Sequence, residues 1–386
     1  MSCNPYHFVD QQVQPRVPCG QDNTMNRRQF LSNSAAAAVA GAGLLATQRA
    51  IFAANESPAR IRIGFIGTSH PHAQGKLAAI RELDSVFELV GVVEPNASLR
   101  DASRSKPEYQ DVKWLDEEAL FATDGLQAVA VETDFPQLLP TAARSVGRGL
   151  FVHLDKPPGD SLPELANLLA EADRRKVYVQ MGYMLRYNSA FDVCFRAAKE
   201  GWLGRIFECN TTMSTVRPAA RRKDLDAGQA KGGAMFDLGS HVIDAVITVL
   251  GPPEKVTPYG RKLYSKQDEV VDNQLAVFEY PDAIATVRAT FVEPFAGERR
   301  QFVLCGENGT MEIRPLEPPE LRLSLQKPMG GFKAGPQTVK LEPMEGRYHA
   351  QLRDFANIVL GKAKPRWNTG HDLAVQKALL QSCALM

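Results

Sequence analysis

Residues 59–83 decide the fold, and they read ARIRIGFIGTSHPHAQGKLAAIREL. A short β-branched run ends at Gly64 and Gly67, and apolar residues at helical spacing follow from Leu77 to Leu83. A strand, a glycine turn and a helix in this order are typical of the first unit of a parallel α/β sheet. In such a unit, the backbone N–H groups at the start of the helix can hold a phosphate.

Three further apolar runs repeat the strand pattern, and they lie within residues 87–96, 126–133 and 150–157. Each run follows a segment that can form a helix. Strands that alternate with helices predict a doubly wound parallel sheet, a Rossmann domain expected over residues 58–157. Such a sheet binds its ligands at the carboxyl ends of its strands.

The turn after the first strand carries a modified form of the glycine pattern of dinucleotide-binding sheets. Gly67 supplies the first glycine, whereas Ser69 and His72 occupy the second and third positions. Glu94 ends the second strand, where a carboxylate can bind ribose hydroxyls and repel a 2′-phosphate. This acid favours NAD over NADP, with a solvated strand end as the alternative interpretation of Glu94.

His70 and His72 lie in the same turn and raise the hypothesis of a metal site. Two histidines without further ligands at a recognisable spacing are weak support for zinc, so no metal is expected here. The alternatives are a loop contact to cofactor or substrate and a purely structural role.

Length and composition exclude several classes of function. A chain of 386 residues fits two domains. The formal net charge is +1, and no basic run is interleaved with aromatic residues, so no nucleic-acid partner is expected. The cysteines lack the short paired spacing of a zinc or iron–sulfur site.

Residues 25–54 have the organisation of an export signal. The pair Arg27 and Arg28 precedes Phe-Leu and a weakly apolar, Ala/Gly-rich stretch. This order resembles a twin-arginine signal, and the apolar stretch is too short for a permanent membrane anchor. The protein is therefore expected in the periplasm or cell envelope, with cleavage near Ala53 or Ala54. Residues 1–24 remain unassigned.

The segment GGAMFDLGSHVIDAV, residues 232–246, places three titratable side chains in an apolar run. On a helix, Asp237 and His241 would share one face, because they are four residues apart. An acid beside an imidazole is suited to moving a proton, whereas a polar stripe facing water is the alternative. Asp244 is expected to be an orienting or structural partner.

Together these motifs resemble the glucose-fructose oxidoreductase and inositol dehydrogenase family, written Gfo/Idh/MocA. The resemblance runs from about Ile61 to the end of the chain. The segments that carry it are IRIGFIG (61–67), DKPPG (155–159), MGYMLRYNSAF (181–191), GGAMFDLGSHVIDAV (232–246), DNQLAVFEYPDAIATVRATF (272–291) and GENGTMEI (306–313). It implies an α+β C-terminal domain over residues 158–386, with a large, mostly antiparallel sheet.

The resemblance also implies roles for individual residues. Lys156, Asp237 and His241 match the catalytic positions of the family. Arg186 and Tyr187 match positions that usually face substrate, and an interdomain contact is the alternative for both. The residues expected to contact the cofactor are Gly64, Gly67, Thr68, Ser69, His70, Glu94, Thr133 and Lys156.

Three functions are compatible with these residues. The first is an NAD-dependent oxidoreductase acting on a secondary alcohol of a sugar or polyol. In it, His241 is the base, Asp237 its partner, and Lys156 the cation at the reacting oxygen. The second is a glycoside hydrolase or lyase that recycles bound NAD, and the third is a non-catalytic binding protein. A homo-oligomer, dimer or tetramer, is expected because an open sheet face is costly to expose.

Overall fold

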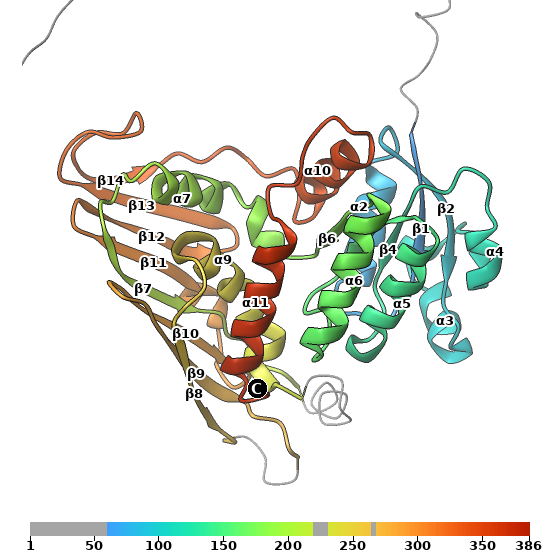
Figure 1. Cartoon of the computed structure of the whole chain (residues 1–386), viewed down its shortest axis with the longest axis horizontal. Helices are drawn as coiled ribbons and strands as arrows, with labels where there is room; N and C mark the ends of the chain where they lie inside the picture. The colour runs from blue at the N-terminus through green and yellow to red at the C-terminus, as the bar shows by residue number, and fades with distance from the viewer. Residues whose placement is uncertain (1–59, 219–230, 264–267) are drawn as a thin grey trace, which may run out of the picture. The chain divides into compact units, whose positions relative to one another are not determined.

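The computed structural model describes residues 60–218, 231–263 and 268–386 (Figure 1). The export signal expected over residues 25–54 and the unassigned residues 1–24 lie outside the described part of the chain. Among the described residues, no helix combines the length and the apolar character needed to cross a membrane. Arg60–Met386 forms one compact unit.

A parallel sheet of six strands has the order β3-β2-β1-β4-β5-β6. Its strands are β1 (Ile61–Ile66), β2 (Phe87–Val93), β3 (Trp114–Leu115), β4 (Ala128–Val131), β5 (Phe151–Leu154) and β6 (Val179–Met181). Strands β1, β2, β4 and β5 coincide with the four apolar runs of the sequence, and the doubly wound sheet is confirmed. Strands β3 and β6 are too short to give a recognisable pattern.

Helices alternate with these strands, as the sequence predicts (Figure 1). They are α2 (Ala73–Glu82), α3 (Ala97–Arg104), η1 (Pro107–Tyr109), α4 (Glu117–Phe121), α5 (Phe135–Gly147) and α6 (Leu162–Arg175). Short polar side chains begin three of them: Asn96, Asp116 and Ser161 each accept a hydrogen bond from a backbone N–H of the first turn.

The parallel sheet continues beyond the boundary expected after Pro157. Strand β6 pairs with β5, for example through Met181 and Leu154. Helix α6 packs on α5, so α6 and β6 both belong to the layers of the parallel sheet. The chain therefore leaves this sheet only after Met181.

The second sheet has eight strands in the order β14-β13-β12-β11-β7-β10-β9-β8. They are β7 (Ile206–Thr212), β8 (Lys255–Arg261), β9 (Asn273–Glu279), β10 (Ile284–Thr290), β11 (Gln301–Gly306), β12 (Gly309–Leu316), β13 (Pro319–Leu325) and β14 (Gly335–Val339). Only the pairing of β7 with β10 is parallel. The expected large, mostly antiparallel sheet is confirmed.

Helices α7, α9 and α11 cover one face of this second sheet (Figure 1). The elements outside the two sheets are η2 (Met184–Tyr187), α7 (Ser189–Lys199), η4 (Met235–Gly239), α9 (Ser240–Leu250), η5 (Ala296–Arg299), α10 (His349–Val359) and α11 (Thr369–Ser382). In β9, Gln274, Ala276 and Phe278 are buried and the residues between them are less so. This alternation is typical of a sheet with one covered face.

Residues 232–246 do not form one regular helix. Met235–Gly239 is a π-helix, and the α-helix α9 begins only at Ser240. A π turn closes on residue i+5. Asp237 therefore lies in a π turn and His241 in the first turn of α9, and both side chains are buried. Short π segments occur frequently at functional sites.

Candidate active site

Functional side chains collect where four parallel strands end. Gly67 follows β1, Glu94 follows β2, Glu132 follows β4, and Asp155 and Lys156 follow β5. All four strands are parallel neighbours in the sheet, so these residues lie along one sheet edge. This is the edge at which open α/β sheets bind their ligands.

The turn after β1 requires a glycine at position 67. Gly67 has a positive φ of 93°, and a Cβ there would lie 2.6 Å from the backbone nitrogen of Thr133. The first glycine of the fingerprint is thus explained by close backbone approach. Gly64 has a different role, because it lies inside β1, where a Cβ would meet the Leu120 side chain at 2.7 Å. Packing against Leu120 accounts for this glycine without a cofactor contact.

The backbone N–H groups of this turn are bonded within the protein. Those of Gly67, Thr68 and His70 donate to the Val93 carbonyl, the Glu94 carboxylate and the Glu132 carbonyl. Pro71 has no N–H, and the N–H of His72 donates to His70 Nδ1 at 3.2 Å. The donors that would hold a pyrophosphate in a standard glycine loop are therefore largely occupied.

Glu94 is buried and ties the turn to the end of β2. Its Oε2 accepts from both the backbone N–H and the hydroxyl of Thr68, each at 2.9 Å. Its Oε1 accepts from the backbone N–H of Asn96 at 3.0 Å. The solvated strand end is therefore wrong as an interpretation of Glu94. Ser69 lies in the same turn, and Thr133 lies where α5 begins, with its hydroxyl donating to the Asp134 carbonyl.

Lys156 meets the second domain directly. Its Nζ donates a hydrogen bond of 2.6 Å to the backbone oxygen of Asp237, and it lies 3.7 Å from the Asp237 carboxylate. The side chain is buried, so Lys156 is not a surface lysine at a strand end. Burial lowers the pKa of Lys156 to about 8, against the opposing effect of Asp237.

Asp237 binds an arginine that the sequence did not single out. Its Oδ2 accepts a hydrogen bond of 2.6 Å from Arg217 Nη2. Arg217 lies at the start of the basic, Gly/Ala-rich residues 217–233, and no motif in that segment marks it as a partner of Asp237. The acid is therefore held between two cations, Lys156 and Arg217.

His241 is buried at the start of α9 beside these residues. Its ring centroid lies 6.0 Å from that of His72 and 6.4 Å from that of Tyr183. Its Nδ1 is buried and has no hydrogen-bond partner among the described residues. Burial, followed by the charge of Lys156, holds the pKa of His241 well below its usual range, so the imidazole is neutral at pH 7.

Arg186 lies in a buried ion-pair network. Its guanidinium donates to Asp244 Oδ1 at 2.7 Å and to Asp372 Oδ1 at 2.6 Å. His371 also contacts Asp244, at 3.0 Å. These contacts join η2, α9 and α11 of the second domain, so the guanidinium of Arg186 is engaged in a structural network rather than in the interdomain contact given as the alternative. They also give Asp244 the structural role expected for it.

The hydroxyl group of Tyr187 is likewise hydrogen-bonded within the protein. Its hydroxyl donates to Asp354 Oδ2 at 2.7 Å and accepts from Gln180 Nε2 at 3.0 Å. Asp354 belongs to α10 and Gln180 to β6, so Tyr187 links the parallel sheet to a C-terminal helix. The interdomain contact is the interpretation that this geometry favours.

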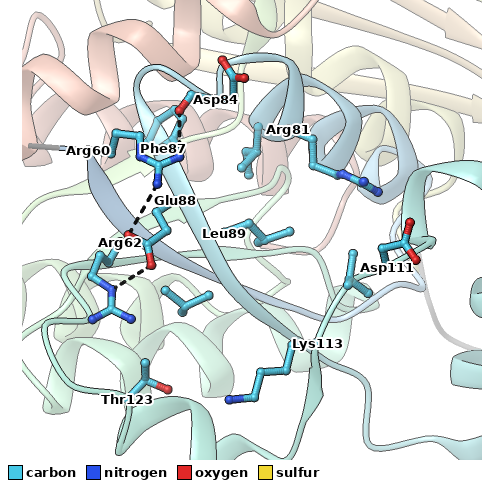
Figure 2. Close-up of a pocket in the computed structure, with 13 residues that line it drawn as sticks. Arg60, Arg62, Arg81, Asp84, Phe87, Glu88, Leu89, Asp111, Lys113 and Thr123 are labelled. Atoms are coloured by element: carbon cyan, nitrogen blue, oxygen red, sulfur yellow. Dashed lines mark hydrogen bonds and ion pairs between the residues drawn. The ribbon is translucent and has the colours of Figure 1, made fainter. Parts of the chain in front are cut away.

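A pocket of about 500 Å³ lies at the opposite end of the same sheet (Figure 2). It is lined by residues that begin β1 and β2, among them Arg60, Arg62 and Glu88 (Figure 2). Arg62 and Glu88 form an exposed ion pair across it. Because ligands of such sheets bind at the carboxyl ends of the strands, this pocket does not belong to the candidate site.

Comparison with known proteins agrees with this arrangement. Residues 195–312 match a family model described as the GFO/IDH/MocA C-terminal domain. The match covers β7 to β11 and the first half of β12 in the second sheet, and it includes Asp237 and His241. It supports the family resemblance that the sequence motifs indicate.

Two curated relatives are oxidoreductases by name. The uncharacterized oxidoreductase YdgJ of Escherichia coli is 24% identical over 227 residues, 58% of this chain and 65% of the relative. The scyllo-inositol 2-dehydrogenase (NADP(+)) IolW of Bacillus subtilis is 25% identical over 153 residues, 40% of this chain and 42% of the relative. The chain thus spans less than two thirds of either relative.

A solved structure shows the same fold over most of the chain. The aldose-aldose oxidoreductase of Caulobacter crescentus, complexed with glycerol, superposes with a TM-score of 0.72 at 16% identity. The superposition covers 84% of this chain and 98% of that protein. The parallel sheet and the mostly antiparallel sheet therefore form the combined architecture of these oxidoreductases.

Proposed function

We propose that this protein is a nicotinamide-dependent oxidoreductase of the GFO/IDH/MocA family that acts on a secondary alcohol of a sugar or polyol. The observation that carries the proposal is the hydrogen bond between Lys156 and the Asp237 backbone, beside the buried His241. It brings together an ammonium, a carboxylate and an imidazole from the two domains. The oxidoreductase names of the relatives and the shared fold support the same reaction class.

The residues at the strand ends fit a dinucleotide in part. The tight turn at Gly67 is present, and Glu94 ends β2 where a ribose would be bound. The N–H groups of Thr68 and His70 are bonded to Glu94 and Glu132, so a pyrophosphate would compete with these internal acceptors. We expect a dinucleotide to bind here. We also expect the carboxylate of Glu94 to favour NAD over NADP.

The side chains suggest a division of labour in alcohol oxidation. When bound, the nicotinamide supplies the hydride acceptor. The ammonium of Lys156 hydrogen-bonds the reacting oxygen and stabilises negative charge that develops on it. The neutral imidazole of His241 accepts the hydroxyl proton, leaving a carbonyl group. Asp237 positions Lys156 through its backbone oxygen and is itself held by Arg217.

The proposal includes export of the protein from the cytoplasm. The twin-arginine pattern of residues 25–54 would deliver the folded enzyme to the periplasm or cell envelope. Fusing residues 1–58 to a reporter that is active only after export tests this directly. Replacement of Arg27 and Arg28 by lysine should retain the reporter in the cytoplasm, and unchanged export would contradict a twin-arginine route.

Turnover tests the catalytic proposal. The full chain is incubated with NAD or NADP and a panel of polyols, aldoses and glycosides, and both reduced cofactor and released sugar are measured. Reduced cofactor, together with a loss of about 100-fold or more in Lys156→Ala, is the expected result. Sugar release without net reduction would indicate the NAD-recycling glycosidase. Neither product, with no dinucleotide bound, would indicate a binding protein.

A further inference from the structure

Four metal-ligating side chains meet beneath the turn after β1. They are His70 and His72 of the turn, Glu132 after β4 and Asp155 after β5, and we call them the His70 cluster. His70, Glu132 and Asp155 have at most 1% of their side chains exposed, and His72 has 15%. The fold thus adds two carboxylates to the two histidines that the sequence alone showed.

The hydrogen bonds of His70 identify the nitrogen that faces the acids. Its Nε2 lies 3.2 Å from the Lys156 backbone oxygen, which only accepts, so Nε2 carries the proton. Nδ1 therefore carries a lone pair, and it accepts the N–H of His72. The same Nδ1 lies 3.4 Å from Asp155 Oδ2 and 3.5 Å from Glu132 Oε2. Three acceptor atoms thus converge.

Glu132 provides an independent indication of a ligand site, because among the described residues its only ion pair with a lysine is to Lys76, at 3.6 Å from Oε1. Its carboxyl group is completely buried, and neither oxygen has a hydrogen-bond donor among the described residues. Buried carboxylates are normally paired, hydrogen-bonded or bound to a metal. The Oε2 atom is directed at the convergence of His70 and Asp155, so a ligand at that point would satisfy it.

The spacing of the donors matches a metal ion. Bonds of about 2.1 Å in tetrahedral geometry separate neighbouring ligand atoms by about 3.4 Å. The His70–Asp155 and His70–Glu132 distances are 3.4 and 3.5 Å. His72 Nδ1 lies 3.1 Å from Asp155 Oδ1, to which it donates a hydrogen bond, so a bound ion would displace the proton of this nitrogen. We infer that the His70 cluster is a binding site for one divalent first-row transition metal ion.

The donor set indicates the chemical class of the ion. Two imidazoles and two carboxylates suit Zn²⁺, Mn²⁺ or Fe²⁺, whereas Ca²⁺ and Mg²⁺ prefer sites made of oxygen alone. The hydrogen bond from His70 Nε2 to a backbone carbonyl is the outer-shell contact that usually orients a histidine ligand. A bound ion would use the lone pair of His70 Nδ1, so it would replace the hydrogen bond that the backbone N–H of His72 donates to this nitrogen.

Lys76 is the main competitor for this role. Its buried Nζ lies 3.3 Å from Asp155 Oδ2 and 3.6 Å from Glu132 Oε1. One ammonium neutralises the charge of only one of the two carboxylates. Lys76 also contacts Oε1 of Glu132, whereas Oε2 is the oxygen that faces His70. The competing arrangement is therefore Lys76 together with a proton shared between Glu132 and Asp155, without any metal.

Cobalt binding separates these two arrangements. The full chain is produced without a polyhistidine tag, stripped with a chelator, and titrated with Co²⁺, whose visible spectrum reports nitrogen and oxygen ligands. We expect one ion per chain, and at least a tenfold loss of affinity in His70→Ala and Glu132→Gln. His349→Ala is the matched control, because His349 also contacts an acid, Glu82, but lies outside the cluster.

The outcome does not depend on catalytic activity. Co²⁺ binding of equal affinity in wild type, His70→Ala and His349→Ala would overturn the inference, as would the absence of binding in wild type. His72→Ala is a second cluster variant for the case that His70→Ala does not fold, because the His72 side chain is partly exposed. Circular dichroism checks the fold of each variant. The site is independent of the proposed dehydrogenase, since a protein without turnover can still bind the ion.

Discussion

Lys156 Nζ donates a 2.6 Å hydrogen bond to the backbone oxygen of Asp237, which joins the end of β5 to the π-helix η4. A buried ammonium held by the other domain is fixed in position before any substrate arrives. Such fixed donors stabilise developing charge without reorganisation. This contact is therefore the structural basis of the proposed alcohol chemistry.

Arg186 should be essential for stability. Arg186→Met leaves the carboxylates of Asp244 and Asp372 buried without their cation, and we expect a loss of about 3–5 kcal/mol in the free energy of unfolding. Urea denaturation followed by circular dichroism measures it. Arg366→Ala, which breaks an exposed pair with Asp192, should change stability little. Equal effects of the two substitutions would contradict the buried network.

Gly67 should tolerate no side chain. Gly67→Ala combines a positive φ with a contact of 2.6 Å to the Thr133 backbone, so it should destabilise the protein by about 1–3 kcal/mol. Gly147→Ala is the control, because that glycine is in helix α5 and nothing lies near its Cβ position. The control should be neutral or stabilising. Thermal unfolding of both variants provides the comparison.

Glu94 should determine cofactor preference. Glu94→Gln removes the charge that repels a 2′-phosphate while keeping an acceptor for Thr68, so the ratio of NAD to NADP affinity should fall by about tenfold or more. Titration of each dinucleotide by calorimetry measures this ratio. The matched variant Glu88→Gln changes an exposed acid at the opposite end of β2. An unchanged ratio in Glu94→Gln would show that the ribose is bound elsewhere.

High pH should destabilise the fold through buried tyrosines. Burial holds the pKa of Tyr183 and of Tyr187 well above its usual range, so both stay neutral in the folded protein. The unfolded chain releases these protons near pH 10, so stability should fall as pH rises above that value, by about 1.4 kcal/mol per pH unit for each tyrosine. Urea midpoints across this range test it. Tyr183→Phe should reduce the slope, and an unchanged slope would contradict this account.

The sequence predicted the elements that depend on local pattern. Apolar runs predicted β1, β2, β4 and β5, because parallel strands that are buried on both faces consist of consecutive hydrophobic residues. The glycine turn marked the end of β1. Gly67 and Lys156 could be placed for the same reason, since each lies at the end of a recognisable strand. Domain boundaries were less accessible, because the three residues of β6 carry no periodicity of their own.

The remaining features depend on contacts between distant segments. The π-helix that contains Asp237 cannot be predicted from the spacing of apolar residues. Arg186 resembles a substrate-binding residue in sequence, yet its two acids come from α9 and α11. Glu132 and Lys76 look like ordinary residues of a strand end and a helix, and only folding brings them to His70 and Asp155.

Isotope transfer tests the central claim most directly. Purified full-length protein is mixed with oxidised cofactor and polyols or aldoses that carry deuterium on their secondary-alcohol carbons, and the nicotinamide is analysed by mass spectrometry. The account predicts that deuterium appears in the reduced nicotinamide with wild type and is nearly absent with Lys156→Ala. A nicotinamide that stays oxidised and unlabelled with every substrate, although the cofactor is bound, would contradict it.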